Sequence, residues 1–434
     1  MRRGFIPFAI ILTVMLTAQG FNELISECKL LIDEGDLVLA EQKLQEILEQ
    51  NNMFATAHYQ LSRIAYMRGD LKKTGEYLRN AITSDPRNEE YRLEYNKIGE
   101  INSMMANGNR KLSGGDYEKA IVKFEQVQEK YPDFPGAPFY IGLANLRSDE
   151  IKEAAANFRL ALKISSNYEK AKRQLKSLAD RTFNSGNQLI RGGEYDQAIS
   201  EYELVLELDP NYYKAHFQLG AIGTKLGDYE NAIERYKKTV EINPLYAKGW
   251  FSLGLGYQRT GQIDKALEML TRSVEVDSGY AKAYAQIGMI YLDQKNYEAS
   301  EISYNKAIQC DPNYAKPYLD LGKLYVLNER WEEAVSTLMR GTDLDGKNYI
   351  GFSILAQAYN VLGQCIKAKE AAYNSIELKS NYAAALFELG IAEKCLGNRT
   401  AALKAFEKAR NDRTWRKQAE YEIEKIKHPE RFEE

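Results

Sequence analysis

Few side chains in this chain have the types and spacing that enzyme chemistry requires. The 434 residues include only three histidines and four cysteines: His58, His216, His428, Cys28, Cys310, Cys365 and Cys395. None of them is spaced as a set of metal ligands, no catalytic nucleophile motif is present, and there is no glycine-rich phosphate loop. We therefore expect no catalytic residue, no metal site and no cofactor, and a hydrolase is the least favoured function.

Cations and aromatic rings that recur at a fixed spacing are better candidates for binding a partner. Lysine recurs every 34 residues at Lys214, Lys248, Lys282 and Lys316, and a second set of cations comprises Arg147, Arg191, Lys225 and Arg259. Two phenylalanines, Phe217 and Phe251, follow the first two lysines of this series at a constant distance. The formal net charge of the chain is only −3, so no general attraction to nucleic acid or to an acidic membrane is expected.

These residues belong to a skeleton that repeats along most of the chain. Its clearest copy consists of Trp250, Leu253, Gly254, Tyr257, Gly261, Ala266 and Leu270. Eleven units of 34 residues begin at Phe21, Ala55, Ile101, Pro135, Ala179, Tyr213, Ala247, Ala281, Ala315, Tyr349 and Ala383. A fixed period of this length indicates an array of small, similar units rather than one globular core.

Each unit reads as two antiparallel helices joined by a short turn. Glycine recurs at position 8, as in Gly254, although it costs about 1 kcal/mol relative to alanine inside a helix. This cost predicts that the second helix approaches closely there, with the small residue at position 20, here Ala266, opposite the glycine. A large residue at position 24, such as Leu270, fills the space between the helices. Glycine near position 15, such as Gly261, predicts a left-handed end to the first helix.

The skeleton resembles the tetratricopeptide repeat family over residues 21–414. The resemblance implies an all-α fold, an α-solenoid in which stacked antiparallel helix pairs form a right-handed superhelix. It also implies that the first helices line a concave groove, with positions 2, 5, 9, 12 and 13 of each unit facing it. The lysine series occupies position 2, the two phenylalanines position 5, and the second set of cations position 13, so these ten residues are the groove candidates. They favour a protein or peptide partner with an acidic or C-terminal segment and apolar anchors. The alternative is that these residue types are common across the family and indicate no particular ligand.

The 34-residue spacing breaks at residues 89–100 and 169–178, and each insertion runs into the next first helix. Two long helices are predicted, over 88–112 and 168–191. The predicted organisation is an N-terminal repeat pair at 21–88, a pair with an extended first helix at 89–168, a C-terminal array with an extended first helix at 169–414, a capping helix at 415–427, and a flexible tail at 428–434. The insertions either form a protruding docking surface or change only the superhelix geometry.

Residues 1–20 have the layout of a secretory signal peptide. Arg2 and Arg3 precede an uncharged apolar run from Phe5 to Thr17, and small residues flank a cleavage site after Gly20. The apolar run is too short to span a bilayer comfortably. We therefore expect a cleaved signal, a periplasmic or secreted protein, and no stable membrane span afterwards. The alternative is an uncleaved signal that tethers the chain to a membrane.

Two cysteines lie near one edge of the predicted array. Cys365 begins a second helix, and Cys395 ends the following first helix, which is its antiparallel neighbour. In an oxidising compartment these residues could form a disulfide. The alternative is two thiols at packing positions.

Three functions follow from these features, in descending order. The first is a non-enzymatic interaction scaffold that is exported from the cytoplasm and acts in cell-envelope assembly or secretion. The second is a glycan- or peptidoglycan-binding scaffold for polysaccharide export, with groove aromatic rings stacking on sugars. The third is the hydrolase.

Overall fold

The computed structural model describes residues 18–432, and every regular element in that part of the chain is a helix. Helices α1 to α22 alternate as the first and second helices of antiparallel hairpins, so the predicted all-α solenoid is confirmed. The helices group into two compact units, with unit 1 ending at Pro210 and unit 2 beginning at Asn211. The domain limits predicted after residues 88 and 168 both fall inside unit 1.

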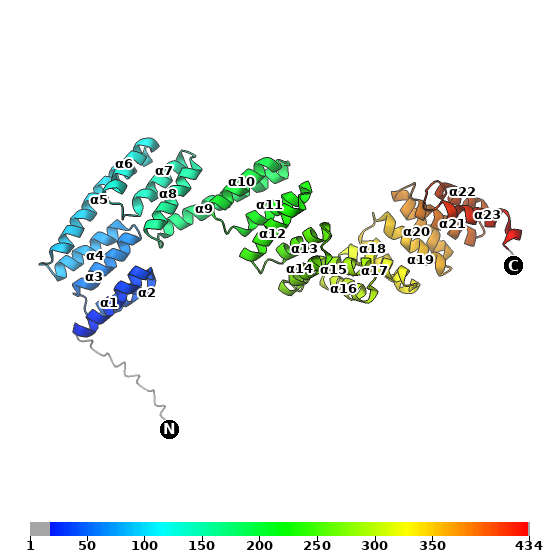
Figure 1. Ribbon diagram of the computed structural model, residues 1–434, viewed down its shortest axis with the longest axis horizontal. Helices are drawn as coiled ribbons and strands as arrows, with labels where there is room; N and C mark the ends of the chain where they lie inside the picture. The colour runs from blue at the N-terminus through cyan, green and yellow to red at the C-terminus, as the bar shows by residue number, and fades with distance from the viewer. Residues whose placement is uncertain (1–17, 433–434) are drawn as a thin grey trace, which may run out of the picture. The chain divides into compact units, whose positions relative to one another are not determined.

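Unit 1 is built from α1 to α10 (Figure 1). In chain order these are α1 (Ala18–Glu34), α2 (Leu37–Gln50), α3 (Ala55–Met67), α4 (Leu71–Ser84), α5 (Glu89–Ser113), α6 (Tyr117–Lys130), α7 (Gly136–Arg147), α8 (Ile151–Ile164), α9 (Glu169–Gly192) and α10 (Tyr195–Leu208).

Unit 2 is built from α11 to α23 and a short final 3-10 turn. In chain order these are α11 (Tyr213–Leu226), α12 (Tyr229–Ile242), α13 (Ala247–Arg259), α14 (Ile263–Val276), α15 (Ala281–Asp293), α16 (Tyr297–Cys310), α17 (Ala315–Leu327), α18 (Trp331–Leu344), α19 (Tyr349–Val361), α20 (Cys365–Leu378), α21 (Ala383–Cys395), α22 (Arg399–Ala409), α23 (Arg416–Lys427) and η1 (Pro429–Arg431).

Glycine at position 8 lets the two helices of a hairpin approach closely. A Cβ on Gly108 of α5 would lie 2.3 Å from a ring carbon of Phe124 in α6, which is fully buried. The nearest group is thus the large side chain at position 24, and not the small residue at position 20 that the sequence predicts there. Position 20 contributes mainly backbone, as where the Ala266 carbonyl lies 3.2 Å from the Cβ position of Gly254.

Glycine at position 15 ends first helices in the left-handed conformation, as predicted. Gly193 and Gly227, for example, have φ of 82° and 84°. Three hairpins lack this glycine, and Asp149, Lys295 and Glu329 adopt the same conformation with φ of 64°, 59° and 57°. Each of these side chains adds about 1 kcal/mol of backbone strain, which the packed hairpins on either side tolerate.

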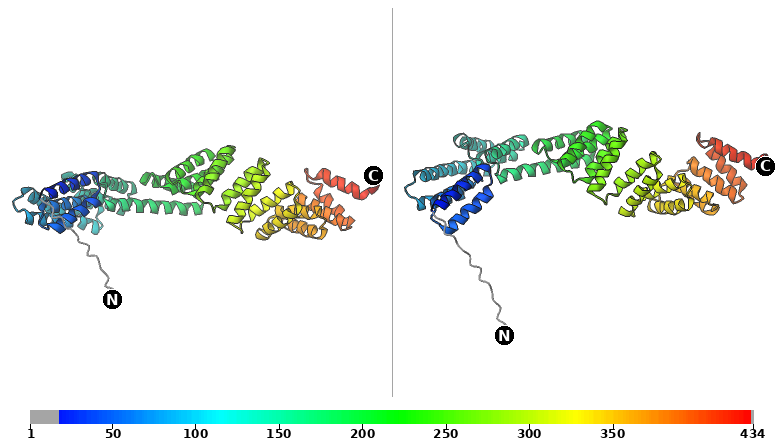
Figure 2. Two further views of the ribbon diagram at one scale, coloured as in Figure 1. Left: turned by 90° about the horizontal axis from the view of Figure 1, so that it is seen from below. Right: turned by 60° about the horizontal axis from the view of Figure 1, so that its bottom comes forward.

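The two long helices predicted at the breaks in spacing are α5 and α9 (Figure 2). The start of α5 contacts α3: the rings of Tyr59 and Tyr91 are 4.9 Å apart, and the Tyr59 hydroxyl donates a hydrogen bond to Glu90 at 2.8 Å. Tyr91 and Ile98 of the insertion are buried, whereas Leu93 is 69% exposed, so residues 89–100 turn one side to the protein and the other to solvent. The choice between a docking surface and a change of superhelix geometry stays a prediction.

The connection between α8 and α9 returns to the first hairpins of unit 1. Asn167 donates a hydrogen bond to the Gly35 carbonyl at 2.6 Å. The Tyr168 ring lies so close to Gly69 that a Cβ there would be 2.4 Å away. Asn167 and Gly35 are 132 positions apart in the sequence, so these contacts join distant segments of unit 1.

The ends of the chain differ from the repeats. The predicted capping helix is α23, which buries Ala419, Ile423 and Ile426. Over residues 428–432 the tail that was expected to be flexible forms η1, and the Phe432 ring lies 5.4 Å from that of Tyr421. The predicted signal peptide falls mostly on residues 1–17, outside the described residues, and its cleavage point lies within α1. None of the helices between residues 18 and 432 has the length and apolar character needed to cross a membrane.

Candidate functional site

The lysine series of unit 2 lies at the start of successive first helices. Lys214, Lys248, Lys282 and Lys316 are each the second residue of α11, α13, α15 and α17, and all four side chains are exposed. A cation at a helix N-terminus opposes the helix dipole by about 0.3–1 kcal/mol. Four lysines in this place therefore do not serve helix stability.

These first helices lie side by side, so the lysines share one edge of the face. Lys248 of α13 lies over a ring of α11, Gln258 of α13 is hydrogen-bonded to Gln286 of α15, and α15 contacts α17. Packed helices are about 8–10 Å apart. The ammonium groups thus recur at a spacing that an extended peptide covers in about three residues.

The lysines differ in what holds them. Lys316 forms an ion pair with Asp320 one turn along α17. Lys214 lies 5.9 Å from the centre of the Tyr213 ring, and Lys248 lies 5.0 Å from the centre of the Phe217 ring. Within the described residues, Lys214, Lys248 and Lys282 form no ion pair with a carboxylate. A bound ligand can therefore supply the negative charge that pairs with them.

The two phenylalanines predicted for the groove differ in how far they are buried. Phe217 is only 8% exposed. Its ring packs 5.5 Å from that of Tyr236 on α12 and 5.3 Å from that of Tyr246, the residue that precedes α13. Phe251 is half-buried, with its ring 5.3 Å from that of Tyr280. Phe217 is therefore a packing residue between repeats, because the next repeat covers the face that would otherwise meet a ligand.

The covering tyrosines are a feature that the sequence prediction missed. Tyr246, Tyr280 and Tyr314 each precede a first helix at the 34-residue spacing, which was the available signal. Each is half-buried, and burial is the main cause that raises the pKa of all three hydroxyls. They stay neutral at physiological pH and can donate hydrogen bonds beside the lysines.

The remaining predicted cations divide between the two units. Lys225 and Arg259 lie in the last turns of α11 and α13 in unit 2, and both are exposed. Arg147 and Arg191 are exposed in the last turns of α7 and α9, and belong to unit 1. Cations in the last turn of a helix are favourable to its dipole, so these four serve the helices regardless of a ligand.

A buried polar pair links two first helices near the C-terminal end of unit 2. The Asn360 amide of α19 donates to a carboxylate oxygen of Glu388 in α21 at 2.8 Å, and to the Glu388 carbonyl at 2.9 Å. Burial raises the pKa of Glu388 to about 7, and the hydrogen bond from Asn360 lowers it by less. This carboxyl therefore titrates near neutral pH.

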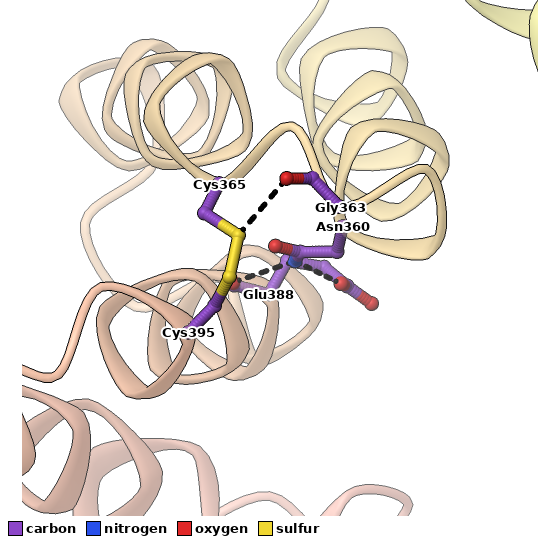
Figure 3. The surroundings of a disulfide bond; sticks show 5 residues. All are labelled: Asn360, Gly363, Cys365, Glu388 and Cys395. Carbon is purple, nitrogen blue, oxygen red and sulfur yellow. Dashed lines mark hydrogen bonds between the residues drawn. A yellow bond between two sulfur atoms is a disulfide. The ribbon is translucent and has the colours of Figure 1, made fainter.

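Cys365 and Cys395 lie beside this pair and are joined by a disulfide (Figure 3). Cys365 is the first residue of α20 and Cys395 the last of α21, with their Cα atoms 6.1 Å apart. The bond connects two consecutive hairpins. It lies at the edge of the array where the sequence analysis places both cysteines. Cys28 and Cys310 are thiols.

Among residues 18–432, no group of three His, Cys, Asp or Glu side chains is placed to hold a metal ion. His58, one of the three histidines, accepts or donates a hydrogen bond at the Asn52 carbonyl, 2.9 Å away. That contact ties the start of α3 to the preceding loop, which is a structural role.

Comparison with known families identifies the repeats. The family described as "Cilia and flagella-associated protein 70 C-terminal domain" matches residues 143–403, which is more than half of the chain. A second family, described as "Tetratricopeptide repeat", matches residues 105–178.

Among curated proteins, DnaJ homolog subfamily C member 3 of chicken (Gallus gallus) is 26% identical over 125 residues. The match covers 29% of this chain and 24% of that protein, so the chain spans about a quarter of the length of this relative.

Solved structures with a similar fold are also repeat proteins. One is YrrB, described as a TPR protein with an unusual peptide-binding site: it is 21% identical, the match covers 43% of this chain and 97% of that one, and the TM-score is 0.39. Another is the C-terminal part of a TPR repeat-containing protein from Cytophaga hutchinsonii, at 19% identity, 55% and 97% coverage and a TM-score of 0.45.

Proposed function

The chain belongs to the family described as "Cilia and flagella-associated protein 70 C-terminal domain" and carries tetratricopeptide repeats. From this membership we propose that the protein is a non-enzymatic scaffold, and that its first-helix face binds acidic segments of protein partners. The family and the repeats support a protein-interaction scaffold. The proposal adds where the partner binds in unit 2 and which charge it carries.

The observation that carries the proposal is the row of lysines at the starts of α11, α13, α15 and α17. Three of these cations have no carboxylate partner in the described chain, although the protein as a whole has more acidic than basic residues. Three cations that lack a carboxylate partner attract a negatively charged segment and orient it. The neutral tyrosine hydroxyls beside the row can donate to the same segment.

The spacing of the row defines the peptide that should bind. The lysines recur at about the length of one turn of polyproline II, which has three residues per turn, so a peptide in that conformation with Glu at every third position presents its carboxylates on one side at the matching spacing. A peptide of the same composition with its Glu residues contiguous does not. The first should bind more tightly at low salt, and the difference should shrink as salt screens the charges.

Charge reversal tests the site by fluorescence anisotropy or calorimetry. In the double variant Lys248→Glu and Lys282→Glu we expect about tenfold weaker binding of the matched peptide, which corresponds to roughly 1.4 kcal/mol. Lys265→Glu with Lys306→Glu, on the second helices α14 and α16, is the matched control and should bind like the wild type. Equal affinity in the wild type and the first variant would refute the proposal.

We further propose that the chain is exported and acts in cell-envelope assembly or secretion. The support is the sequence of residues 1–20 together with the Cys365–Cys395 disulfide, since disulfides persist in oxidising compartments. The family description names cilia and flagella, and the alternative is a place in such an organelle. A mature N-terminus at Phe21, found by N-terminal sequencing, supports export, whereas a retained Met1 in a soluble fraction contradicts it.

The alternative of glycan binding by ring stacking has less support. A ring that stacks on a sugar must present a bare face, and the neighbours of Phe217 are Tyr236, Tyr246 and the Lys248 ammonium. Phe251 is the better candidate of the two because it is half-buried. Binding of purified glycans that is lost in Phe251→Ala would restore this alternative.

A further inference from the structure

Unit 2 contains a cavity of about 400 Å³ at its C-terminal end, beside α21, α22, α23 and η1. The end of α21 supplies Lys394, the turn into α22 supplies Gly397, and the start of α22 supplies Arg399. The rest of the wall comes from α23 and the residues after it, and consists of Lys425, Ile426, Pro429 and Phe432. Since α23 and η1 follow the last repeat, the larger part of this wall lies outside the repeats and their groove.

Contacts among α20, α21, α22 and α23 hold the wall in place. Lys394 forms an ion pair with Glu422 of α23, and the Arg399 guanidinium donates a hydrogen bond to the Ile426 carbonyl. The disulfide described above fixes the end of α21 to α20. A site whose walls are fixed in advance loses less conformational entropy when a ligand enters it. The cavity is therefore organised before binding.

The wall carries positive charge. Its charged side chains are Lys394, Arg399 and Lys425, and among the described residues no Asp or Glu side chain belongs to it. Lys394 already has a carboxylate partner, whereas Arg399 and Lys425 form no ion pair with a carboxylate between residues 18 and 432. A guanidinium has five N–H donors, and the bond to Ile426 occupies only one. An anion that enters the cavity thus meets two cations that it can pair with.

Most of the accessible surface of the wall is apolar. Ile426 is 7% exposed, whereas Phe432 is 37% exposed and packs edge-on against the Tyr421 ring at 5.4 Å. Pro429 adds a third apolar side chain. Covering this surface removes it from water, which favours a ligand with an apolar body. A simple inorganic anion would satisfy the cations and leave this surface uncovered.

We propose that this cavity binds a small organic carboxylate with an apolar body, the chemistry of a medium-chain fatty acid. The carboxylate pairs with Arg399 and Lys425, and the alkyl chain lies against Ile426 and Phe432. The volume lies toward the lower end of ligand pockets, which hold about 300–1,000 Å³, so it admits one small molecule. The site is separate from the lysine row and does not rest on the proposed function.

The test uses the full chain with 13C-labelled Ile methyl groups and four small probes. Octanoate should give saturable chemical-shift changes at the Ile426 methyl groups. Octanol has the same chain without the charge, and should bind about tenfold more weakly. Octylammonium, which the cations repel, and acetate, which lacks the chain, should give no saturable shift in the same concentration range.

Three results would overturn the proposal. The first is absence of saturable shifts at Ile426 with octanoate, including the case in which the chain's own Glu433 and Glu434 fill the site. The second is equal affinity for octanoate and octanol, which would remove the role of the cations. The third is tighter binding of N-acetyl-phenylalanine than of octanoate. That probe carries a free carboxylate beside a ring, and its preference would assign the cavity to the C-terminal residue of a protein.

Two variants with matched controls test the wall. Lys425→Glu should weaken octanoate binding about tenfold, whereas Lys427→Glu, at an exposed residue of α23 outside the wall, should not. Phe432→Ala removes apolar surface and should weaken it by a similar factor, with Leu378→Ala, at a 43% exposed residue of α20, as the control. Circular dichroism checks that each variant is folded. Unchanged octanoate affinity in folded Lys425→Glu and Phe432→Ala would contradict the site.

The same samples separate this proposal from the lysine row. Reversal of Lys248 and Lys282 should leave the octanoate shifts at Ile426 unchanged, and Lys425→Glu should leave the binding of the matched acidic peptide unchanged. If the acidic peptide does not bind the wild type but octanoate does, only the proposed lysine site fails. The reverse result removes only the carboxylate cavity.

Discussion

The ammonium group of Lys248 lies 5.0 Å from the centre of the Phe217 ring, joining the second residue of one first helix to the preceding first helix. The rings of Tyr236 and Tyr246 pack against the same phenylalanine, which is only 8% exposed. A residue predicted to meet a ligand is thus a joint between consecutive hairpins. Its replacement should act on stability first.

For Phe217→Ala we therefore expect a loss of about 3 kcal/mol in the free energy of unfolding, as for other large-to-small changes in a core. Chemical denaturation followed by circular dichroism measures it. Phe251→Ala is the comparison, and should cost less because that ring is half-buried. Equal losses in the two variants would show that Phe217 is no more buried than Phe251.

Two glycines of one helix predict opposite effects of the same substitution. At Gly99 of α5 a Cβ would meet nothing within 4 Å, so Gly99→Ala should stabilise the protein by up to about 1 kcal/mol through helix propensity. At Gly108 the Cβ would lie 2.3 Å from the Phe124 ring, and Gly108→Ala should destabilise it. Thermal unfolding of both variants gives the two signs, and a stabilised Gly108→Ala would contradict the close packing of α5 on α6.

The disulfide should stabilise the last hairpins of unit 2. Closing a loop between residues 30 apart in sequence removes entropy from the unfolded chain worth about 3 kcal/mol. Cys365→Ser with Cys395→Ser, or reduction, should lower the stability of this region by up to that amount. Cys310→Ser is the control because Cys310 is a thiol. Mass spectrometry of non-reduced peptides checks the bond, and two free thiols in the native protein would remove it from this account.

Glu388 should make unit 2 less stable as the pH rises through neutrality. Its folded pKa, raised to about 7 by burial, exceeds the unfolded value near 4.5. Below the unfolded pKa the carboxyl is protonated in both states and folding loses nothing. As the pH rises from there through 7, the carboxyl loses its proton first in the unfolded chain. The free energy of unfolding therefore falls, by a few kcal/mol at most.

The variant Glu388→Gln should remove this dependence. It should match the wild type near pH 4 and be more stable than the wild type near pH 8. Glu377→Gln, at an exposed site on α20, is the control for loss of one negative charge. Parallel stability curves for Glu388→Gln and wild type from acid to alkaline pH would contradict the raised pKa.

The sequence was sufficient to predict the elements but not how neighbouring repeats cover one another. The ends of α5 and α9, and the left-handed turns at Gly193 and Gly227, follow from local rules of helix length and glycine conformation. The burial of Phe217 does not, because position 5 gives only the direction of the side chain, whereas Tyr246 of the next repeat decides what covers it.

The contact between α5 and α3 escaped prediction for a similar reason. The break at residues 89–100 was visible, but its spacing did not show that Lys97 and Ile98 would face Tyr66 and Met67. That arrangement depends on how α5 packs against α3. The ion pair of Lys97 with Asp133 joins residues far apart in sequence, and no local pattern indicates it.

The most direct test of the central claim is to map where an acidic peptide binds. A peptide with Glu at every third position and one photoreactive residue is crosslinked to the full chain, and the sites are identified by mass spectrometry. We predict crosslinks on the first helices α11, α13, α15 and α17, reduced in the variant with Lys248→Glu and Lys282→Glu. Crosslinks confined to the second helices α12, α14, α16 and α18, or unaffected by the charge reversal, would contradict the account.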